Sequence, residues 1–152
     1  MGFDDLSSSR FRALFCEFSK TSGYAYNLGG SMKSLTYPSG RVVNYTVDSA
    51  GRLLSAVDAN GTNYVSTAAY NADSSAKSLL VGNNGSFAGI TSSFLYNPRL
   101  QLCRITAWTS GSVPSSCIDP AVHGNLMDRG YNFNLGSSNN GNVISITNYR
   151  DT

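Results

Sequence analysis

From Ser34 onward, hydrophobic and polar positions alternate in short runs, and each run ends at a turn signal. Eight runs are rich in the β-branched, aromatic and aliphatic residues that favour strands, and they recur at near-regular spacing. The eight runs are Arg41–Val47, Arg52–Val57, Tyr64–Tyr70, Ala76–Gly82, Ile90–Tyr96, Leu100–Trp108, Leu126–Asn134 and Asn142–Tyr149. Because most intervening segments have hairpin length, the pattern predicts a mainly all-β protein built as an antiparallel hairpin meander.

Turn signals of recognisable types separate these runs. Tyr37–Gly40 has proline second and glycine fourth, as a type I turn prefers. Asp48–Gly51 and Asp58–Gly61 begin with aspartate, which can accept backbone N–H groups, and end with glycine, which tolerates positive φ. Asn-Asn-Gly occurs at 83–85 and 139–141, and Asn-Gly is a strong hairpin signal. These residues are therefore predicted to fix hairpin register.

The chain divides into two parts by pattern. Residues 1–33 form an N-terminal segment, and residues 34–152 form the strand-rich region. In the first part, phenylalanine and leucine residues at helix spacing predict a short amphipathic helix over Ser9–Lys20. Such a helix would pack on the edge of the sheet, with binding to a partner as the alternative. In the second part, residues 109–125 are rich in Ser, Gly and Pro and predict one long loop.

A degenerate repeat runs through the strand-rich region. Its mark is an aromatic or β-branched residue followed by Asp or Asn, then a turn and another strand. The pairs are Val47-Asp48, Tyr70-Asn71, Tyr96-Asn97 and Phe133-Asn134. The steps between them are 23, 26 and 37 residues, and the last step includes the long loop. The spacing indicates roughly two strands per unit.

The residues of this repeat carry a resemblance to a known family. The segments Tyr37–Gly61, Tyr96–Ala107 and Asn139–Thr147 look like the YD repeats of the Rhs and teneurin family. The signature of that family runs approximately Tyr-x-Tyr-Asp-x-x-Gly-Arg-Leu before an apolar strand. The resemblance covers about Leu35–Asp151, although Val47 stands where the signature has tyrosine.

In that family the repeats form β-hairpins that wind into a long sheet, often closing into a shell that encapsulates a toxin or forms a cell-surface scaffold. The resemblance implies a structural segment of a larger secreted or cell-surface protein, of bacterial type and without catalysis. Its partners would be further YD repeats or another copy, which pair through the sheet edges. Tyrosine and arginine would stack across strands on one face. The residues expected to set the turns and the aromatic ladder are Tyr37, Gly40, Tyr45, Asp48, Gly51, Arg52, Asp58, Gly61, Tyr70 and Tyr96.

Composition narrows the classes of partner. Charged residues make up 13% of the chain, about half of the usual ~25%. The net charge is only +2 and the basic residues are scattered, so we expect no nucleic-acid partner. No apolar run is long enough to span a bilayer, and acidic residues near the start do not suit a signal peptide.

Candidate chemistry is sparse. The one histidine, His123, lies six residues after Cys117, but neither an orienting group nor an oxyanion site can be identified. A zinc site that adds Cys16 and Cys103 lacks a Cys-x-x-Cys pair. Turn geometry already explains the aspartates of the Asp-x-x-Gly turns. We therefore expect no catalytic residue, cofactor or metal, and an enzyme centred on Cys117 and His123 is the least favoured hypothesis.

Two interpretations of Cys103 stay open. It can form a disulfide with Cys117 that closes the long loop, which requires an oxidising compartment. In the chain-entropy model a loop of ~15 residues stabilises the fold by about 3 kcal/mol. The alternative is a small buried hydrophobic residue on a strand.

A second function class also stays open. An antiparallel meander has two unpaired edges that can accept a strand, and exposed Tyr, Asn and Arg side chains can bind carbohydrate or peptide. The sequence therefore predicts a structural repeat segment, with a small binding module as the alternative.

Overall fold

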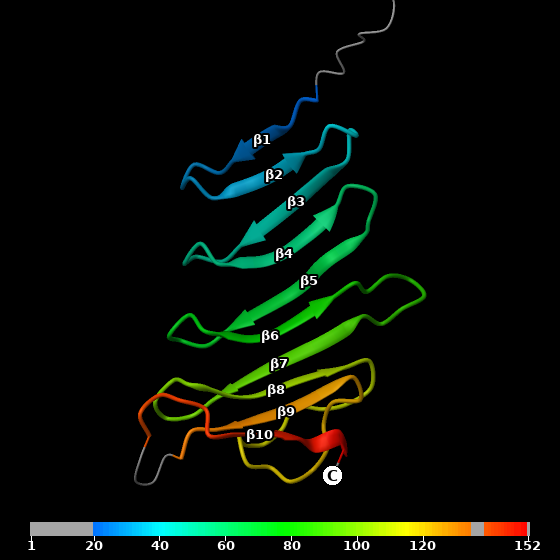
Figure 1. The fold of residues 1–152 in the computed structure, drawn as a ribbon. Helices are drawn as coiled ribbons and strands as arrows, with labels where there is room; N and C mark the ends of the chain where they lie inside the picture. The colour runs from blue at the N-terminus through cyan, green and yellow to red at the C-terminus, as the bar shows by residue number, and fades with distance from the viewer. Residues whose placement is uncertain (1–19, 135–138, 152) are drawn as a thin grey trace, which may run out of the picture.

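The computed structural model describes residues 20–134 and 139–151. Within them, ten strands form one antiparallel sheet whose spatial order follows the chain (Figure 1). The strands are β1 (Gly23–Tyr26), β2 (Met32–Thr36), β3 (Val42–Val47), β4 (Leu53–Asp58), β5 (Asn63–Tyr70), β6 (Ala76–Val81), β7 (Ile90–Tyr96), β8 (Leu102–Trp108), β9 (Met127–Asn132) and β10 (Ser145–Asn148). A short 3₁₀ helix, η1 (Tyr149–Asp151), follows β10. The predicted all-β antiparallel meander is confirmed.

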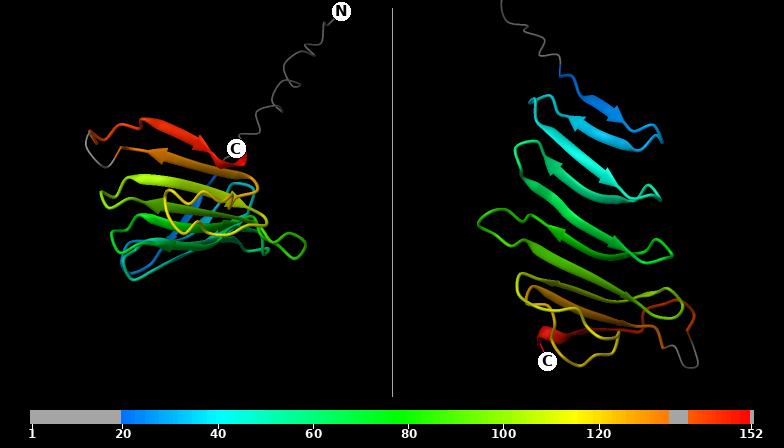
Figure 2. Two further views of the ribbon diagram at one scale, coloured as in Figure 1. Left: turned by 90° about the horizontal axis from the view of Figure 1, so that it is seen from below. Right: turned by 180° about the vertical axis from the view of Figure 1, so that it is seen from behind.

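The sheet is a single twisted layer along most of its length (Figure 2). Among the described residues, the buried apolar side chains are only Val43, Ala56, Ala68 and Cys103. The connection between β8 and β9, residues 109–126, folds back over the last strands, and we call it the C-terminal cap (Figures 1 and 2). It lies against the last strands, as the hydrogen bonds of Arg104 to Asp119 and Ala121 show.

The sheet begins earlier than the sequence pattern indicated. Strand β1 lies wholly inside the segment assigned to residues 1–33, and the boundary between residues 33 and 34 falls within β2. All four residues of β1 are exposed, so no hydrophobic stripe marked it as a strand. The sheet boundary therefore moves to Gly23. The predicted helix over Ser9–Lys20 lies outside the described residues, apart from Lys20.

Six of the described turns share one geometry. In each, the N–H of the first residue donates to the C=O of the fifth, and the N–H of the fourth donates to the C=O of the first, at 2.8–3.0 Å. The turns are Asn27–Ser31, Tyr37–Arg41, Asp48–Arg52, Asp58–Thr62, Asn71–Ser75 and Asn97–Gln101. The fourth residue always has positive φ, and it is glycine in four turns but Ser74 and Leu100 in the other two. One turn type thus sets the register of successive hairpins.

A register shift accompanies five of these turns. It lies where the strand enters the turn, at Tyr26, Val47, Val57, Tyr70 and Tyr96. Such bulges increase the local twist of a hairpin. The repeat unit found in the sequence is therefore a bulge followed by a five-residue turn.

Candidate functional site

The first residue of the signature turn uses its side chain to hold the turn. Asp48 Oδ1 accepts the N–H groups of Ala50 and Arg52, each at 2.9 Å, and Oδ2 accepts Arg52 Nε at 2.7 Å. The backbone hydrogen bond from Arg52 is the largest cause that lowers the pKa of Asp48, and partial desolvation opposes it. Asp48 is thus an ionised turn residue and has no proton to give near neutral pH.

Asparagine performs the same task in the equivalent turns. Asn97 Oδ1 accepts the N–H groups of Arg99 and Gln101, at 2.9 and 3.1 Å. Its Nδ2 donates to Gln101 Oε1 at 2.9 Å, as Asn71 Nδ2 does to Ser75 Oγ. Because an uncharged amide replaces the carboxylate, acidity is not what the position supplies.

The fifth residue of the turn reaches to the next turn on the same side of the sheet. The ring of Tyr70 lies 4.9 Å below the Arg52 guanidinium. Arg52 Nη1 donates to the carbonyl of Asn71 at 3.2 Å, while Tyr70 Oη donates to the carbonyl of Leu53 at 2.8 Å. Arg52 therefore ties two successive hairpins together.

A second arginine repeats this arrangement on the opposite side of the sheet. The Arg41 guanidinium lies 4.3 Å from the centroid of the Tyr37 ring and 5.6 Å from that of Tyr64. Its Nε is 4.0 Å from Asp58 Oδ2. Asp58 is buried, and its Oδ1 also accepts the N–H of Asn60 at 2.7 Å. Arg41 was not among the residues that the signature singled out.

The remaining predicted positions have simpler roles. Gly40, Gly51 and Gly61 each occupy the fourth position of a turn, with φ of 81°, 78° and 91°. Tyr45 and Tyr96 lie on β3 and β7, and neither stacks on an arginine within the described part of the chain. The aromatic ladder is thus limited to Tyr37 and Tyr70 among the four predicted tyrosines.

The C-terminal cap is held by an ion pair that the sequence reading did not anticipate. Arg104 on β8 and Asp128 on β9 are both fully buried, with Nε–Oδ1 at 2.8 Å and Nη2–Oδ2 at 2.9 Å. Arg104 also donates to the carbonyls of Asp119 and Ala121 in the cap. The Tyr149 ring lies 3.8 Å from the Arg104 guanidinium. One arginine thus joins two strands, the cap and η1.

The Asp128 carboxylate accepts hydrogen bonds from both the sheet and the cap. Besides Arg104, its Oδ2 accepts the N–H of His123 at 2.6 Å. Burial pushes the pKa of Asp128 upward, but the hydrogen bonds from Arg104 and His123 outweigh it, and the pKa is lowered overall. The carboxylate therefore stays ionised inside the fold.

A chain of polar side chains runs along the cap. Ser112 Oγ lies 2.7 Å from His123 Nδ1, and His123 Nε2 lies 2.9 Å from Asp119 Oδ2. Ser115 Oγ donates to the same Asp119 oxygen at 2.7 Å. The Ser115 side-chain hydrogen bond is the largest cause that holds the pKa of Asp119 well below its ordinary value. These contacts fix the shape of the loop.

Cys103 and Cys117 form a disulfide, with Cα atoms 5.5 Å apart. Cys103 is buried on β8, so the bond fastens the cap to the sheet. A Cys117 thiolate that attacks with His123 as base is not available while this bond is intact. Within the described residues, 20–134 and 139–151, no three His, Cys, Asp or Glu side chains gather to hold a metal ion. No helix in the same ranges is long and apolar enough to cross a membrane.

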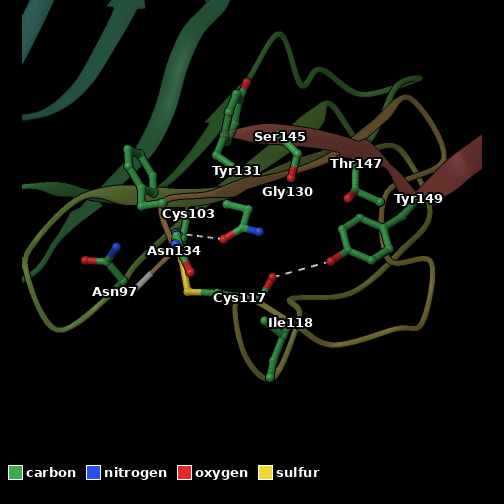
Figure 3. A pocket seen from close by; sticks show the side chains of 12 residues that line it. Asn97, Cys103, Cys117, Ile118, Gly130, Tyr131, Asn134, Ser145, Thr147 and Tyr149 are labelled. Carbon is green, nitrogen blue, oxygen red and sulfur yellow. Dashed lines mark hydrogen bonds between the residues drawn. A yellow bond between two sulfur atoms is a disulfide. The ribbon is translucent and has the colours of Figure 1, made fainter. Parts of the chain in front are cut away.

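A cavity of about 390 Å³ lies between the cap and the last two strands (Figure 3). Its lining carries amides, hydroxyls and apolar groups. The lining residues are Asn97, Cys103, Cys117, Ile118, Gly130, Tyr131, Asn132, Phe133, Asn134, Ser145, Thr147 and Tyr149. No side chain among them is charged.

Solved structures similar to this chain come from toxin complexes. One is the Tc holotoxin pore of Photorhabdus luminescens with the mutation TccC3-D651A, at 21% identity and a TM-score of 0.64. Another is TcdB2-TccC3 without its hypervariable C-terminal region, at 22% identity and a TM-score of 0.64. A complex described as TcdB2-TccC3-Cdc42 matches at 20% identity and a TM-score of 0.65. No family model and no curated protein matches the chain.

These likenesses concern a small part of long proteins. Each match covers 85% of this chain but only 5% of the toxin chain. At such identities the likeness establishes the fold, and it supports the predicted Rhs-like arrangement of hairpins. The class of the chain is thus an all-β repeat sheet of the kind found within these toxin complexes.

Proposed function

We propose that the chain is a structural β-sheet segment of a larger secreted or cell-surface scaffold, or of a shell that encloses a toxin, without catalysis of its own. The observation that carries this proposal is the single-layered sheet with one repeated turn, whose outermost strands β1 and β10 each have one unpaired edge within the described part of the chain. Repeat units of this kind gain stability chiefly from their neighbours. Further hairpins added at the edges would continue the same sheet.

Three other features support a structural role. The toxin chains that share the fold belong to large assemblies by their names. The repeated turn has Asp at its first position in one place and Asn in another, an exchange that register setting tolerates and acid–base chemistry does not. The disulfide suits an oxidising compartment outside the cytosol.

The second candidate is a binding module. The cavity beside β10 and the open edge of that strand favour it. Binding would use the C-terminal end of the sheet rather than its turns.

Electron cryomicroscopy of the complete polypeptide that contains this sequence tests the scaffold proposal. We expect strands from flanking segments to pair with β1 or β10, so that the sheet continues beyond the ten strands. A complete protein in which both edges face solvent, or are covered by an unrelated domain, would contradict the proposal.

A further inference from the structure

Strand β10 combines three features that are not found together elsewhere in the described sheet: an open edge, exposed apolar side chains and an adjacent cavity. In the described chain it pairs only with β9. Ile146 on the strand is 61% exposed, and Ile144, which directly precedes the strand, is 58% exposed. Open edges usually carry charges or proline that block pairing, but the Ser-Ile-Thr-Asn sequence of β10 has neither.

The cavity lies directly beside this edge. Ser145 is the cross-strand partner of Asn132, and Thr147 is the partner of Gly130, so these four residues share one face of β9 and β10. Ser145 and Thr147 point toward Cys117 and Ile118 of the cap (Figure 3). None of the four is larger than asparagine, and the cavity lies between this face of the sheet and the cap.

The walls of the cavity are held in place by strong contacts. The disulfide fixes the Cys117 side, and Arg104 holds the Tyr149 ring against the sheet. A Cβ atom at Gly130 would lie 2.8 Å from the Tyr149 ring, so glycine is what lets the ring approach this closely. The cavity is therefore preformed and does not need to be opened by a ligand.

The polar side chains of β9 and β10 that line the cavity have donors and acceptors that are not used within the described chain. Ser145 Oγ, Thr147 Oγ1 and Asn132 Nδ2 make no hydrogen bond to another described residue. The only side-chain bond of Asn132 is from the N–H of Asn134 to its Oδ1, at 2.9 Å. Since the lining is uncharged, an ionised group placed in it would lose hydration without gaining an opposite charge.

We propose that the β10 edge and this cavity form a docking site for an extended peptide segment. The segment adds to β10 as the next antiparallel strand and places an uncharged side chain, aromatic or aliphatic, over the cavity. Main-chain hydrogen bonds to the edge supply affinity, and the cavity supplies the side-chain preference. Ile146, on the other face of β10, packs against the neighbouring side chains of the added strand.

The opposite edge of the sheet, β1, has no part in this cavity. Among the described strands β1 likewise pairs on one side only, and it exposes Tyr24 and Tyr26, but the cavity beside β10 has no lining residue from β1. The two edges therefore differ in specificity, and β1 serves as an internal control. This inference goes beyond the scaffold role, because it assigns a side-chain preference to one edge, and it leaves β1 as the edge at which the scaffold sheet continues.

Selection from a random displayed peptide library on the oxidised chain tests the proposal. We expect the selected peptides to share alternating residues with an uncharged apolar residue at one fixed position. A synthetic peptide of that sequence should bind about tenfold more weakly, or worse, to Ser145→Glu, which charges the cavity, and to Ile146→Lys, which guards the edge. NMR should show new amide protection at β10.

Two matched variants complete the test. Thr67→Glu places the same negative charge at an exposed threonine of β5, away from the cavity. Tyr26→Lys places the same lysine charge on the edge strand β1. Both should bind the peptide as the parent chain does. Failure to select any peptide, equal binding by all four variants, or equal weakening by Tyr26→Lys overturns the docking site. A chain whose sheet continues in the complete protein but which selects no peptide keeps the scaffold role and loses this site.

Discussion

Arg104 and Asp128 form a two-point ion pair from which solvent is fully excluded. The planar guanidinium presents two parallel donors to the two carboxylate oxygens, a geometry that lysine cannot reproduce. Its other donors reach the cap, so the pair sits where the two strands, the loop and η1 meet. In a sheet with so few buried apolar residues, this polar cluster is the main packed centre of the C-terminal end.

Removal of one partner should therefore be costly. Arg104→Met leaves the Asp128 carboxylate buried without its cation, and we expect a loss of about 3–5 kcal/mol of unfolding free energy. The double variant Arg104→Met with Asp128→Leu removes both charges and should be less destabilised than the sum of the single variants. Urea unfolding of the four proteins measures this coupling. Additive effects would mean that the pair contributes no specific coupling.

The sequence predicted the hairpins more reliably than it predicted this centre. Turns can be recognised from residues close together in the sequence, such as Asp48 and Gly51. These turns separate eight of the strands and predict their order. Arg104 and Asp128 are 24 residues apart, and each is a lone charge in an alternating strand. A local pattern cannot show that two such charges meet under a loop.

The misses at the other end have a different cause. Neither β2 nor β1 was among the eight predicted strands. β1 has only four residues, and all four are exposed, so it has no buried face that would mark it as a strand. Its Asn27–Ser31 turn has the same hydrogen bonds as the signature turns and was the available signal. His123 was noticed, but its partners are Ser112 and Asp119 rather than the nearby cysteine.

Reduction of the disulfide should loosen the cap without erasing the sheet. The Cys103–Cys117 bond closes a loop with a separation of 14 residues, for which the chain-entropy model gives about 3 kcal/mol. We expect Cys117→Ser or added reductant to lower stability by about that amount. Thiol counting after denaturation should find at most one free thiol in the unreduced chain and three after reduction. Three thiols before reduction would show that the bond does not form.

Leu100 offers a test of the turn rule. It occupies the fourth turn position with φ of 60°, where the equivalent Gly51 has φ of 78°. The left-handed region costs a non-glycine residue about 1 kcal/mol or more, and the Leu100 side chain is 64% exposed. Leu100→Gly should therefore stabilise the chain by about 0.5–1 kcal/mol, and Gly51→Ala should destabilise it by a similar amount. Thermal unfolding checks both, and destabilisation by Leu100→Gly would contradict a shared turn geometry.

The bridge between successive turns can be tested at Arg52. Arg52→Ala removes the stacking on Tyr70, the hydrogen bond to the Asn71 carbonyl and the ion pair with Asp48 inside its own turn. Because the group is partly exposed, we expect a loss of about 1 kcal/mol. Arg129→Ala, an exposed arginine on β9, is the matched control and should change stability by less than about 0.5 kcal/mol. Equal effects of the two substitutions would remove Arg52 from the set of register-holding residues.

Acid should act on the same buried pair with a defined sign. The pKa of Asp128 is lowered in the folded chain, because the hydrogen bonds from Arg104 and His123 outweigh the effect of burial. The contribution of a carboxyl with a lowered pKa is complete above its ordinary value of 3.8 and is lost as the pH falls through the folded value. We therefore expect the chain to lose stability below about pH 4. In the Arg104→Met variant the buried Asp128 carboxylate has lost its cation and gains from protonation, so this variant should lose less stability over the same range. Unfolding free energies of both proteins at neutral and acidic pH measure the difference, and parallel losses would show that Asp128 is not the group that titrates.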